Sequence, residues 1–357
     1  MSESRQGIES FVRPELAGFI GYSACKSPDS FPGRVVKLDA NENNYGASPR
    51  AREALARFEG YHIYPDAAQS ELRRELAAYT GIPAENIVAG AGSDQLIDLV
   101  IRLFCAPGEE IINLPPTFAM FSFYAKLQGV RVVSVPRDER FLIDTAGIKK
   151  AVTAATKLIF VANPNNPTGT LAPEETIREI LALGLPTIVD EAYFEFTGRT
   201  FACQLEKIPN LMVLRTFSKW AGLAGLRVGY GLFPKRVAEI LHAVRDPYNV
   251  NAAAMVAARE SLKDVELLRE KVRLITAERE RLYGELERLG WLKPYPSQAN
   301  FILCRVLKGE ALALQAALEA RGVLTRYFNS PGIENCIRFS VGRPEEDDIL
   351  LSELKKL

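Results

Sequence analysis

The chain contains few of the residues that hold metal ions or disulfide frameworks. Its 357 residues include two histidines and five cysteines, and neither His62 nor His242 lies near a cysteine pair. A structural zinc site needs several cysteine or histidine ligands close together, so we expect no metal site. The cysteines are odd in number, scattered and without a C-x-x-C pair, which indicates free thiols in a cytoplasmic protein.

Net charge and long apolar runs are also lacking. The 44 Lys and Arg residues balance 44 Asp and Glu residues, whereas a dedicated nucleic-acid binder is normally basic. No uncharged apolar run is long enough to span a membrane, and the N-terminal stretch MSESRQGIES has no apolar signal core. We therefore expect no nucleic-acid partner, no membrane insertion and a cytoplasmic location.

The composition that remains is that of an ordinary globular protein, 47% hydrophobic and 25% charged. The length predicts two domains. We expect an N-terminal arm and the start of a small domain in residues 1–45, and a large domain in residues 46–260. Residues 261–357 are predicted to form a long linking helix, over about 264–289, and the rest of the small α+β domain.

From Ile87 onward, apolar strands alternate with amphipathic helices. This alternation predicts an α/β fold whose mostly parallel central sheet is flanked by helices on both faces. In such sheets, ligands bind beyond the carboxyl ends of the strands. Polar residues gather at those predicted ends, and they are Ser93, Asp94, the stretch 163–166, Asp190, Ser218 and Lys219.

Lys219 follows the apolar run 211–214 and the hydroxyl residues Thr216 and Ser218. A lysine that is partly removed from water, near another cation, has a lowered pKa and can act as a nucleophile. The alternative is a surface lysine in a loop, because most lysines lie on the surface. This segment alone fits both interpretations.

Two further strand ends carry unusual polar residues. The stretch 163–169, NPNNPTG, has three asparagines, more than one turn needs, which favours a function for Asn166 as a donor to a phenolic oxygen. Asp190 ends an apolar run, where a carboxylate is costly without a cation. Either a protonated pyridine ring nitrogen or an internal arginine would supply that cation.

Anion-binding groups are the third feature. The segment 90–94, GAGSD, opens a helix, whose N-terminal N–H groups bind anions; a tight turn capped by Ser93 is the alternative. Arg227 lies in an apolar stretch, which indicates that it faces an anion. Arg326 and Arg338 lie in two late strands, and each fits either strand alternation or a clamp for carboxylate or phosphate.

Together these segments resemble the fold-type I pyridoxal 5'-phosphate (PLP) enzymes, and within them the class I/II aminotransferases. The resemblance covers nearly the whole chain, and its main motifs, NPNNPTG, VDEAYFEF and TFSKWAGLAGLRVGYG, occur in the family's order and spacing. Shorter stretches, among them LDANENNYG, YPD and CIRFSVG, are more narrowly similar to the histidinol-phosphate aminotransferases. The resemblance implies a large domain, a smaller α+β domain and PLP as the cofactor.

The resemblance also implies a role for each matching residue at the cofactor. Lys219 would form the internal aldimine and then move the proton between substrate and cofactor. Asp190 would keep the pyridine nitrogen protonated, and Asn166 and Tyr193 would bind the ring's phenolic oxygen. Phe118 stands where the family usually has Tyr, so it would stack on the ring without a hydroxyl. The implied phosphate-binding residues are Ser93, Asp94, Thr216, Ser218, Arg227 and, at the cofactor of the neighbouring subunit, Tyr64.

At the substrate, the resemblance implies that Arg338 clamps a carboxylate. Arg326 would meet the phosphate of histidinol phosphate, together with Tyr22 of the partner subunit. Because Tyr64 and Tyr22 would both cross to another protomer, the protein is expected to be a homodimer with shared active sites.

The implied reaction is a ping-pong amino transfer through Lys219 in histidine biosynthesis. Histidinol phosphate and 2-oxoglutarate would be interconverted with imidazole-acetol phosphate and glutamate. An aromatic amino-acid aminotransferase and a threonine-phosphate decarboxylase would use the same cofactor residues. A non-catalytic PLP-binding module is the alternative outside enzymes, and the intact set of Lys219, Asp190 and Arg227 argues against it.

Overall fold

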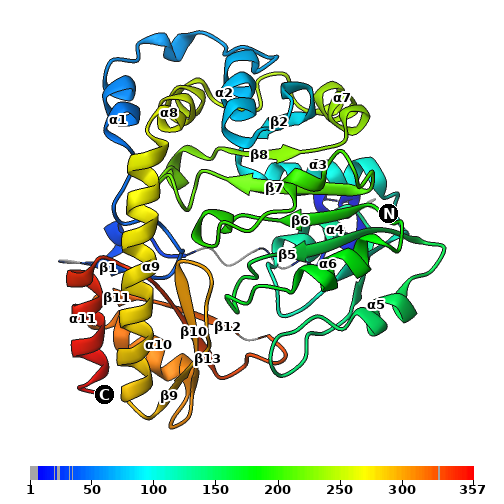
Figure 1. Cartoon of the computed structure of the whole chain (residues 1–357). Coiled ribbons are helices and arrows are strands. Elements are labelled where there is room, and N and C mark those ends of the chain that lie inside the picture. Colours follow the sequence, from blue (N-terminus) through cyan, green and yellow to red (C-terminus); the bar gives the residue numbers. More distant parts are fainter. Residues whose placement is uncertain (1–6, 20, 22–24, 32, 34, 329) are drawn as a thin grey trace, which may run out of the picture.

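Two sheet-containing regions lie side by side in the computed structural model, which describes residues 7–357 apart from 20, 22–24, 32, 34 and 329 (Figure 1). Helix α9, Val265–Arg288, runs along both of them and confirms the long helix predicted over 264–289. Its first half contributes Leu268 and Ile275 to the core of the larger region, and its second half contributes Leu282 and Leu286 to the core of the smaller one. One helix therefore supports both regions.

The central sheet has seven strands in the order β2–β8–β7–β6–β5–β3–β4. Five adjacent strands run parallel, namely β7, β6, β5, β3 and β4, and β8 is antiparallel to both of its neighbours. The prediction of a mostly parallel sheet is thus confirmed. The strands are β2 (Ile87–Gly90), β3 (Glu110–Asn113), β4 (Arg131–Ser134), β5 (Thr156–Ala162), β6 (Thr187–Asp190), β7 (Leu211–Thr216) and β8 (Gly229–Leu232).

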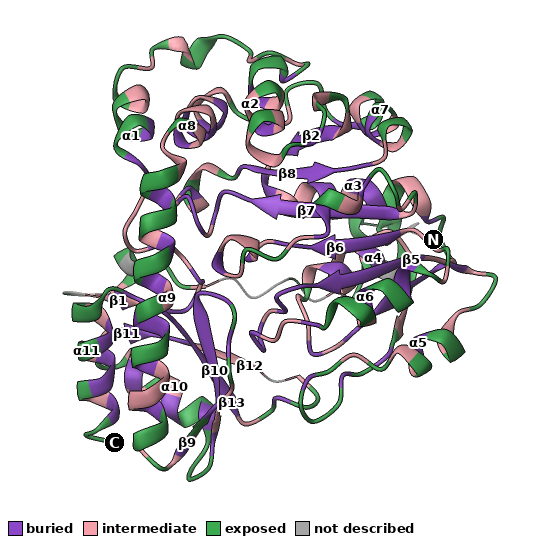
Figure 2. Cartoon of the chain, viewed as in Figure 1, coloured by how far each residue is buried: buried purple, intermediate pink, exposed green. Residues whose placement is uncertain are grey.

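The strands at the middle of this sheet are buried on both faces (Figure 2). Successive side chains of a strand point to opposite faces, so Ile188 of β6 packs in one core and Val189 in the other. One face is covered by α3 (Gly92–Phe104), α4 (Met120–Leu127) and α7 (Lys235–Val244). The other is covered by α1 (Pro49–Ala56), α2 (Ser70–Thr80), α5 (Thr145–Ala151), α6 (Glu174–Leu181) and α8 (Ala252–Lys263).

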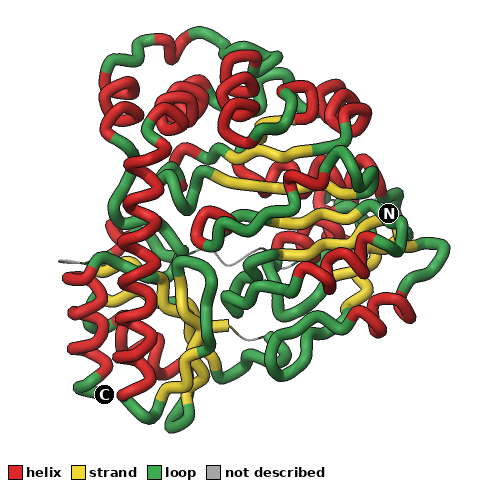
Figure 3. The backbone as a smooth tube through the Cα atoms, viewed as in Figure 1, coloured by secondary structure: helices red, strands yellow, loops and turns green. Residues whose placement is uncertain are grey.

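The smaller region combines a short early segment of the chain with its last strands and helices. Strand β1 (Val36–Lys37) pairs in parallel with β11 (Val323–Leu324). Beside them lies an antiparallel sheet of β9 (Leu292–Pro294), β10 (Phe301–Val306), β12 (Arg326–Phe328) and β13 (Cys336–Ser340). Helices α10 (Ala311–Glu319) and α11 (Pro344–Leu354) complete its core. In Figure 3, loops run between these strands and those of the central sheet.

No helix in the described part of the chain combines the length and the apolar character needed to cross a bilayer.

Candidate active site

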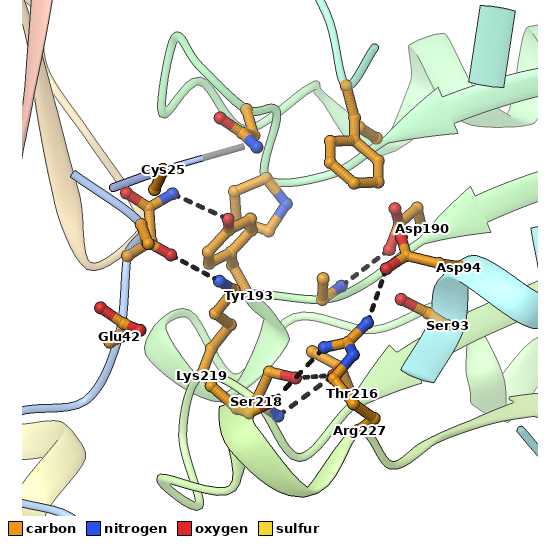
Figure 4. A pocket seen from close by; sticks show the side chains of 18 of the residues that line it. Cys25, Glu42, Ser93, Asp94, Asp190, Tyr193, Thr216, Ser218, Lys219 and Arg227 are labelled. Atoms are coloured by element: carbon orange, nitrogen blue, oxygen red, sulfur yellow. Dashed lines mark hydrogen bonds and ion pairs between the residues drawn. The ribbon is translucent and has the colours of Figure 1, made fainter. Parts of the chain in front are cut away.

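A cavity of about 350 Å³ lies at the carboxyl ends of β5, β6 and β7, beside the segment that follows β1 (Figure 4). Its position agrees with the rule that ligands bind beyond the carboxyl ends of parallel strands. The predicted site residues that line it are Ser93, Asp94, Phe118, Asn166, Asp190, Tyr193, Thr216, Ser218, Lys219, Arg227 and Arg338.

Lys219 lies inside this cavity rather than on the outer surface. It comes three residues after the end of β7, and its Nζ donates a hydrogen bond to the backbone oxygen of Ala40 over 2.8 Å. Burial first of all, and then the guanidinium of Arg338, lower the pKa of Lys219 to about 8. A larger share of the amine is therefore neutral near pH 7 than for an ordinary lysine, which favours attack on a carbonyl carbon.

Asp190, at the end of β6, is a buried carboxyl with no lysine or arginine within 4 Å among the described residues. The backbone N–H of Ala192 donates to it over 3.1 Å, yet burial still raises its pKa to about 7. The internal arginine considered for Asp190 belongs instead to the next residue, since Glu191 pairs with Arg215 over 2.9 Å, both fully buried. Asp190 thus offers a charge that a cationic ligand would neutralise.

Further polar groups converge at the same carboxyl edge of the sheet. Ser93 and Asp94 lie in the first turn of α3, where backbone N–H groups have no intrahelical acceptor. Nearby, the hydroxyl of Thr216 donates to that of Ser218 over 3.0 Å. A Cβ at Gly229 would lie 2.5 Å from the nitrogen of Ser93, so only glycine lets β8 approach this turn.

The expectation that Arg227 lies in an apolar surround is wrong. Its side chain is 49% exposed at the edge of the cavity and pairs with Asp94 over 2.7 Å. Its apolar neighbours in the sequence suggested an apolar environment. Arg227 has a φ of 53°, however, and this left-handed backbone conformation turns its side chain away from them. Together with the helix N-terminus and the two hydroxyls, its guanidinium forms a group of donors suited to a phosphate.

The three asparagines of the stretch 163–169 do different things. The side-chain oxygen of Asn163 accepts from the Ala172 N–H over 2.8 Å, and Asn165 donates to Pro116 O over 2.9 Å. These two therefore build the turn, so the argument from their number is wrong. Asn166 lines the cavity, where its side-chain oxygen accepts a 2.6 Å hydrogen bond from Arg338.

Arg338 extends from β13 into the cavity and is 5% exposed. Besides Asn166, its guanidinium donates to the backbone oxygen of Asp39 over 2.6 Å. It also lies 5.2 Å from the ring centre of Phe301 and 5.3 Å from that of Phe328. These contacts fix a buried cation beside Lys219, in a position to bind a carboxylate.

The residues after β1 belong to the motif LDANENNYG, and no role was predicted for them. Ala40, Asn41 and Glu42 line the cavity, and so does Cys25. Asn41 is buried with a φ of 54°, and its side-chain amide donates to the hydroxyl of Tyr193 over 2.9 Å. The signal was the run of polar residues directly after a strand, the same signal that singled out the other strand ends.

Two of the predicted residues that the structure describes do not line the cavity in this chain. Arg326 lies outside it, with Nη1 3.9 Å from the Sγ of Cys25, which itself lines the cavity. Tyr64 is 77% exposed at the surface, away from the cavity of its own chain. Tyr22 lies outside the described residues.

The cavity therefore contains an amine of lowered pKa, a buried carboxyl with no lysine or arginine of the described chain beside it, and a group of phosphate donors. These match the aldehyde, the ring nitrogen and the phosphate of pyridoxal phosphate, and the residues fit that cofactor. Among the described residues, no three His, Cys, Asp or Glu side chains are grouped in a way that could hold a metal ion.

Comparisons with family models, with known proteins and with solved structures all point to the same family. The family model described as aminotransferase class I and II matches residues 33–354. Histidinol-phosphate aminotransferase of Dehalococcoides mccartyi (strain CBDB1) is 57% identical over 352 residues, which cover 98% of each chain. The chloroplastic enzyme of that name from Nicotiana tabacum is 42% identical over 99% of this chain and 89% of its own. The solved structure of histidinol-phosphate aminotransferase from Sinorhizobium meliloti in complex with pyridoxal-5'-phosphate has a TM-score of 0.87 and 27% identity, covering 97% of both chains.

Proposed function

The chain belongs to the class I and II aminotransferases, and from that premise we propose that it transfers an amino group between histidinol phosphate and 2-oxoglutarate. The observation that carries the reaction class is the meeting of Lys219, Asp190 and the phosphate donors in one cavity. The substrate rests on the 57% identity with a histidinol-phosphate aminotransferase over nearly the full length of both chains. A cytoplasmic location, supported by free cysteines, is part of the proposal.

Pyridoxal phosphate, when bound, supplies the electron sink that stabilises a carbanion at the substrate's reacting carbon. Lys219 would hold the cofactor, and its amine would also move the proton at the substrate's reacting carbon. Its lowered pKa supports this alternation between base and acid near neutral pH. Asp190 would keep the ring nitrogen protonated. Tyr193, whose hydroxyl accepts a hydrogen bond from Asn41, would bind the phenolic oxygen together with Asn166.

Arg338 binds the carboxylate of glutamate and of 2-oxoglutarate. Its planar guanidinium forms two parallel hydrogen bonds to a carboxylate, and binding exchanges the present contact with Asn166 for the ligand. Histidinol phosphate has no α-carboxylate, so its phosphate has to share this cationic end of the cavity. Arg326, next to Cys25, is the second cation for that phosphate.

We also propose a homodimer in which Tyr64 of each protomer contacts the cofactor phosphate of the other. The support is that Tyr64 is 77% exposed and lies apart from the cavity of its own chain. Tyr22 of the partner subunit remains a prediction at the substrate phosphate.

A half-reaction assay tests the substrate. The purified protein with its cofactor is mixed separately with histidinol phosphate, glutamate, phenylalanine and threonine phosphate, and the absorbance of the lysine-bound cofactor is followed. We expect histidinol phosphate and glutamate to convert the cofactor to its amine form. Failure of histidinol phosphate overturns the substrate; faster conversion by phenylalanine indicates an aromatic aminotransferase, and carbon dioxide from threonine phosphate a decarboxylase.

A further inference from the structure

Tyr64 does not stand alone on the surface. Its ring stacks on that of Tyr248, with the ring centres 4.4 Å apart and the planes 17° from parallel. Both rings are open to solvent, at 77% for Tyr64 and 45% for Tyr248. Neither hydroxyl has a hydrogen-bond partner among the described residues. One face of Tyr64 is thus held by a neighbour while its hydroxyl is left available for a group outside this chain.

The loop that carries Tyr248 is fixed by Arg245. Its Nη1 donates to three oxygens of the loop itself, those of Asp246 at 2.9 Å, Pro247 at 3.1 Å and the Asn249 side chain at 3.0 Å. Its Nη2 donates to the backbone oxygen of Ala67, in the segment that follows Tyr64. The guanidinium therefore joins the two loops whose aromatic rings stack on each other.

The same two loops are fastened to the turn that opens the phosphate-binding end of the cavity. The amide of Gln69 donates to Ala89 O over 3.0 Å and to the side chain of Asn249 over 2.9 Å. Asn249 in turn donates to Ala89 O over 2.9 Å and to Gln95 over 2.8 Å, and Gln95 accepts from Ala91 N. The stacked pair consequently rests on the rigid end of β2 and the start of α3.

We propose that Tyr248 is a positioning residue that, by stacking on Tyr64, orients the Tyr64 hydroxyl toward the cofactor phosphate of a second copy of this chain. This inference rests on the proposed homodimer with shared sites. An exposed tyrosine on a loop samples several side-chain rotamers, and ordering it on binding reduces affinity. The stack limits these rotamers before the two copies meet, so less ordering is left for the cofactor to impose.

The first experiment compares Tyr248→Ala with Tyr248→Phe and Tyr64→Phe. Cofactor affinity is measured by titrating the protein with pyridoxal phosphate and following the visible band of the lysine-bound form. We expect Tyr248→Ala to weaken the affinity roughly 3- to 10-fold, the scale of one aromatic stack. Tyr248→Phe keeps the ring and should retain wild-type affinity, whereas Tyr64→Phe keeps the stack and should lose it. Equal losses for Tyr248→Ala and Tyr248→Phe would overturn the stacking role.

A hybrid dimer distinguishes positioning from a structural effect within one protomer. Protomers carrying Lys219→Ala and Tyr248→Ala are given different tags and the mixed dimer is isolated. The only site with a lysine then lies in the Tyr248→Ala protomer, and it receives Tyr64 from the protomer whose Tyr248 is intact. We expect the affinity of this site to return to the wild-type value. If it stays as weak as in the Tyr248→Ala homodimer, Tyr248 acts within its own protomer and the inference is wrong.

The same hybrid made with Tyr64→Ala separates this inference from the proposed function. Restored affinity with Tyr64→Ala but not with Tyr248→Ala overturns the inference alone. If neither hybrid is restored, or if no mixed dimer forms, the shared-site homodimer itself is wrong, and the role of Tyr248 with it.

Discussion

The two halves of the cavity are built in different ways. The cofactor half consists of Asp190, Thr216 and the start of α3, each attached directly to the buried central sheet. The substrate half brings together Arg338 from β13, Cys25 and the residues after β1. Its contacts join distant parts of the chain, as in the 2.6 Å hydrogen bond from Arg338 to Asp39.

The half that performs the chemical step is therefore held rigidly, whereas the half that binds the substrate can adjust. Strands buried on both faces fix the cofactor half, because any shift of β6 or β7 would disturb two cores at once. The substrate half depends on how the smaller region sits against the sheet. Substitutions in the first half should therefore change the chemical step, and those in the second should change which substrate is bound.

The largest effect is expected for Lys219→Ala. Without the amine there is no covalent attachment and no proton transfer, so initial transamination rates should fall about 10⁴-fold or more. Lys219→Arg, which keeps the charge but not the nucleophile, is the control and should be equally inactive and lack the visible band. Activity of Lys219→Ala within tenfold of the wild type would show that the cofactor half does not carry out the chemical step.

Two neighbouring carboxylates test whether chemistry and architecture are separable within the cofactor half. Asp190→Asn keeps the shape and removes the charge, so kcat should fall about 10²- to 10³-fold, as for loss of one preorganised electrostatic partner. The urea midpoint should not fall, since Asp190 has no cationic partner within 4 Å among the described residues. Glu191→Gln leaves the buried Arg215 unpaired and should lower the free energy of unfolding by about 3–5 kcal/mol. A loss of stability in Asp190→Asn, or a loss of kcat without a loss of stability in Glu191→Gln, would contradict this separation of chemistry from architecture.

In the substrate half, Arg338→Ala should raise the KM for glutamate about 30-fold or more, the loss expected when one partner of a buried charge pair is truncated. Arg326→Ala should raise the KM for histidinol phosphate about tenfold and leave cofactor affinity unchanged. Steady-state kinetics with each substrate and a cofactor titration measure both. Loss of the cofactor from Arg326→Ala would show that this arginine belongs to the other half.

The smallest expected effect is on the pH dependence of cofactor binding, in which Arg338 of the substrate half acts on Lys219 of the cofactor half. Only the neutral amine of Lys219 attacks the cofactor. The rate at which cofactor-free protein binds pyridoxal phosphate should therefore rise about tenfold per pH unit below the pKa of about 8 and level off above it. Arg338 helps to lower that pKa, and Arg338→Gln should therefore move the plateau to higher pH. Stopped-flow absorbance across pH 6 to 10 measures the profile. An unchanged plateau would mean that the two halves are electrostatically independent.

The same contrast explains how far the sequence could be interpreted. The parallel sheet and the residues at its strand ends were predictable, because the alternation of strands and helices puts those ends at one edge. Two local inferences were wrong, since the left-handed turn at Arg227 and the turn-building contacts of Asn163 and Asn165 depend on backbone conformation and distant partners. Asn41 was missed for a related reason, because its contact with Tyr193 joins residues far apart in the chain.

The pairing of β1 with β11 has a consequence for how the protein is made. Val36 is synthesised well before its partner Val323. Domains fold as units during synthesis, N-terminal parts first. All strands of the central sheet precede Val323, so we expect the cofactor half of the cavity to form before the substrate half. The segment 40–42 meets its neighbours only after β10 to β13 have been synthesised, so the substrate half is completed after the strands of the cofactor half.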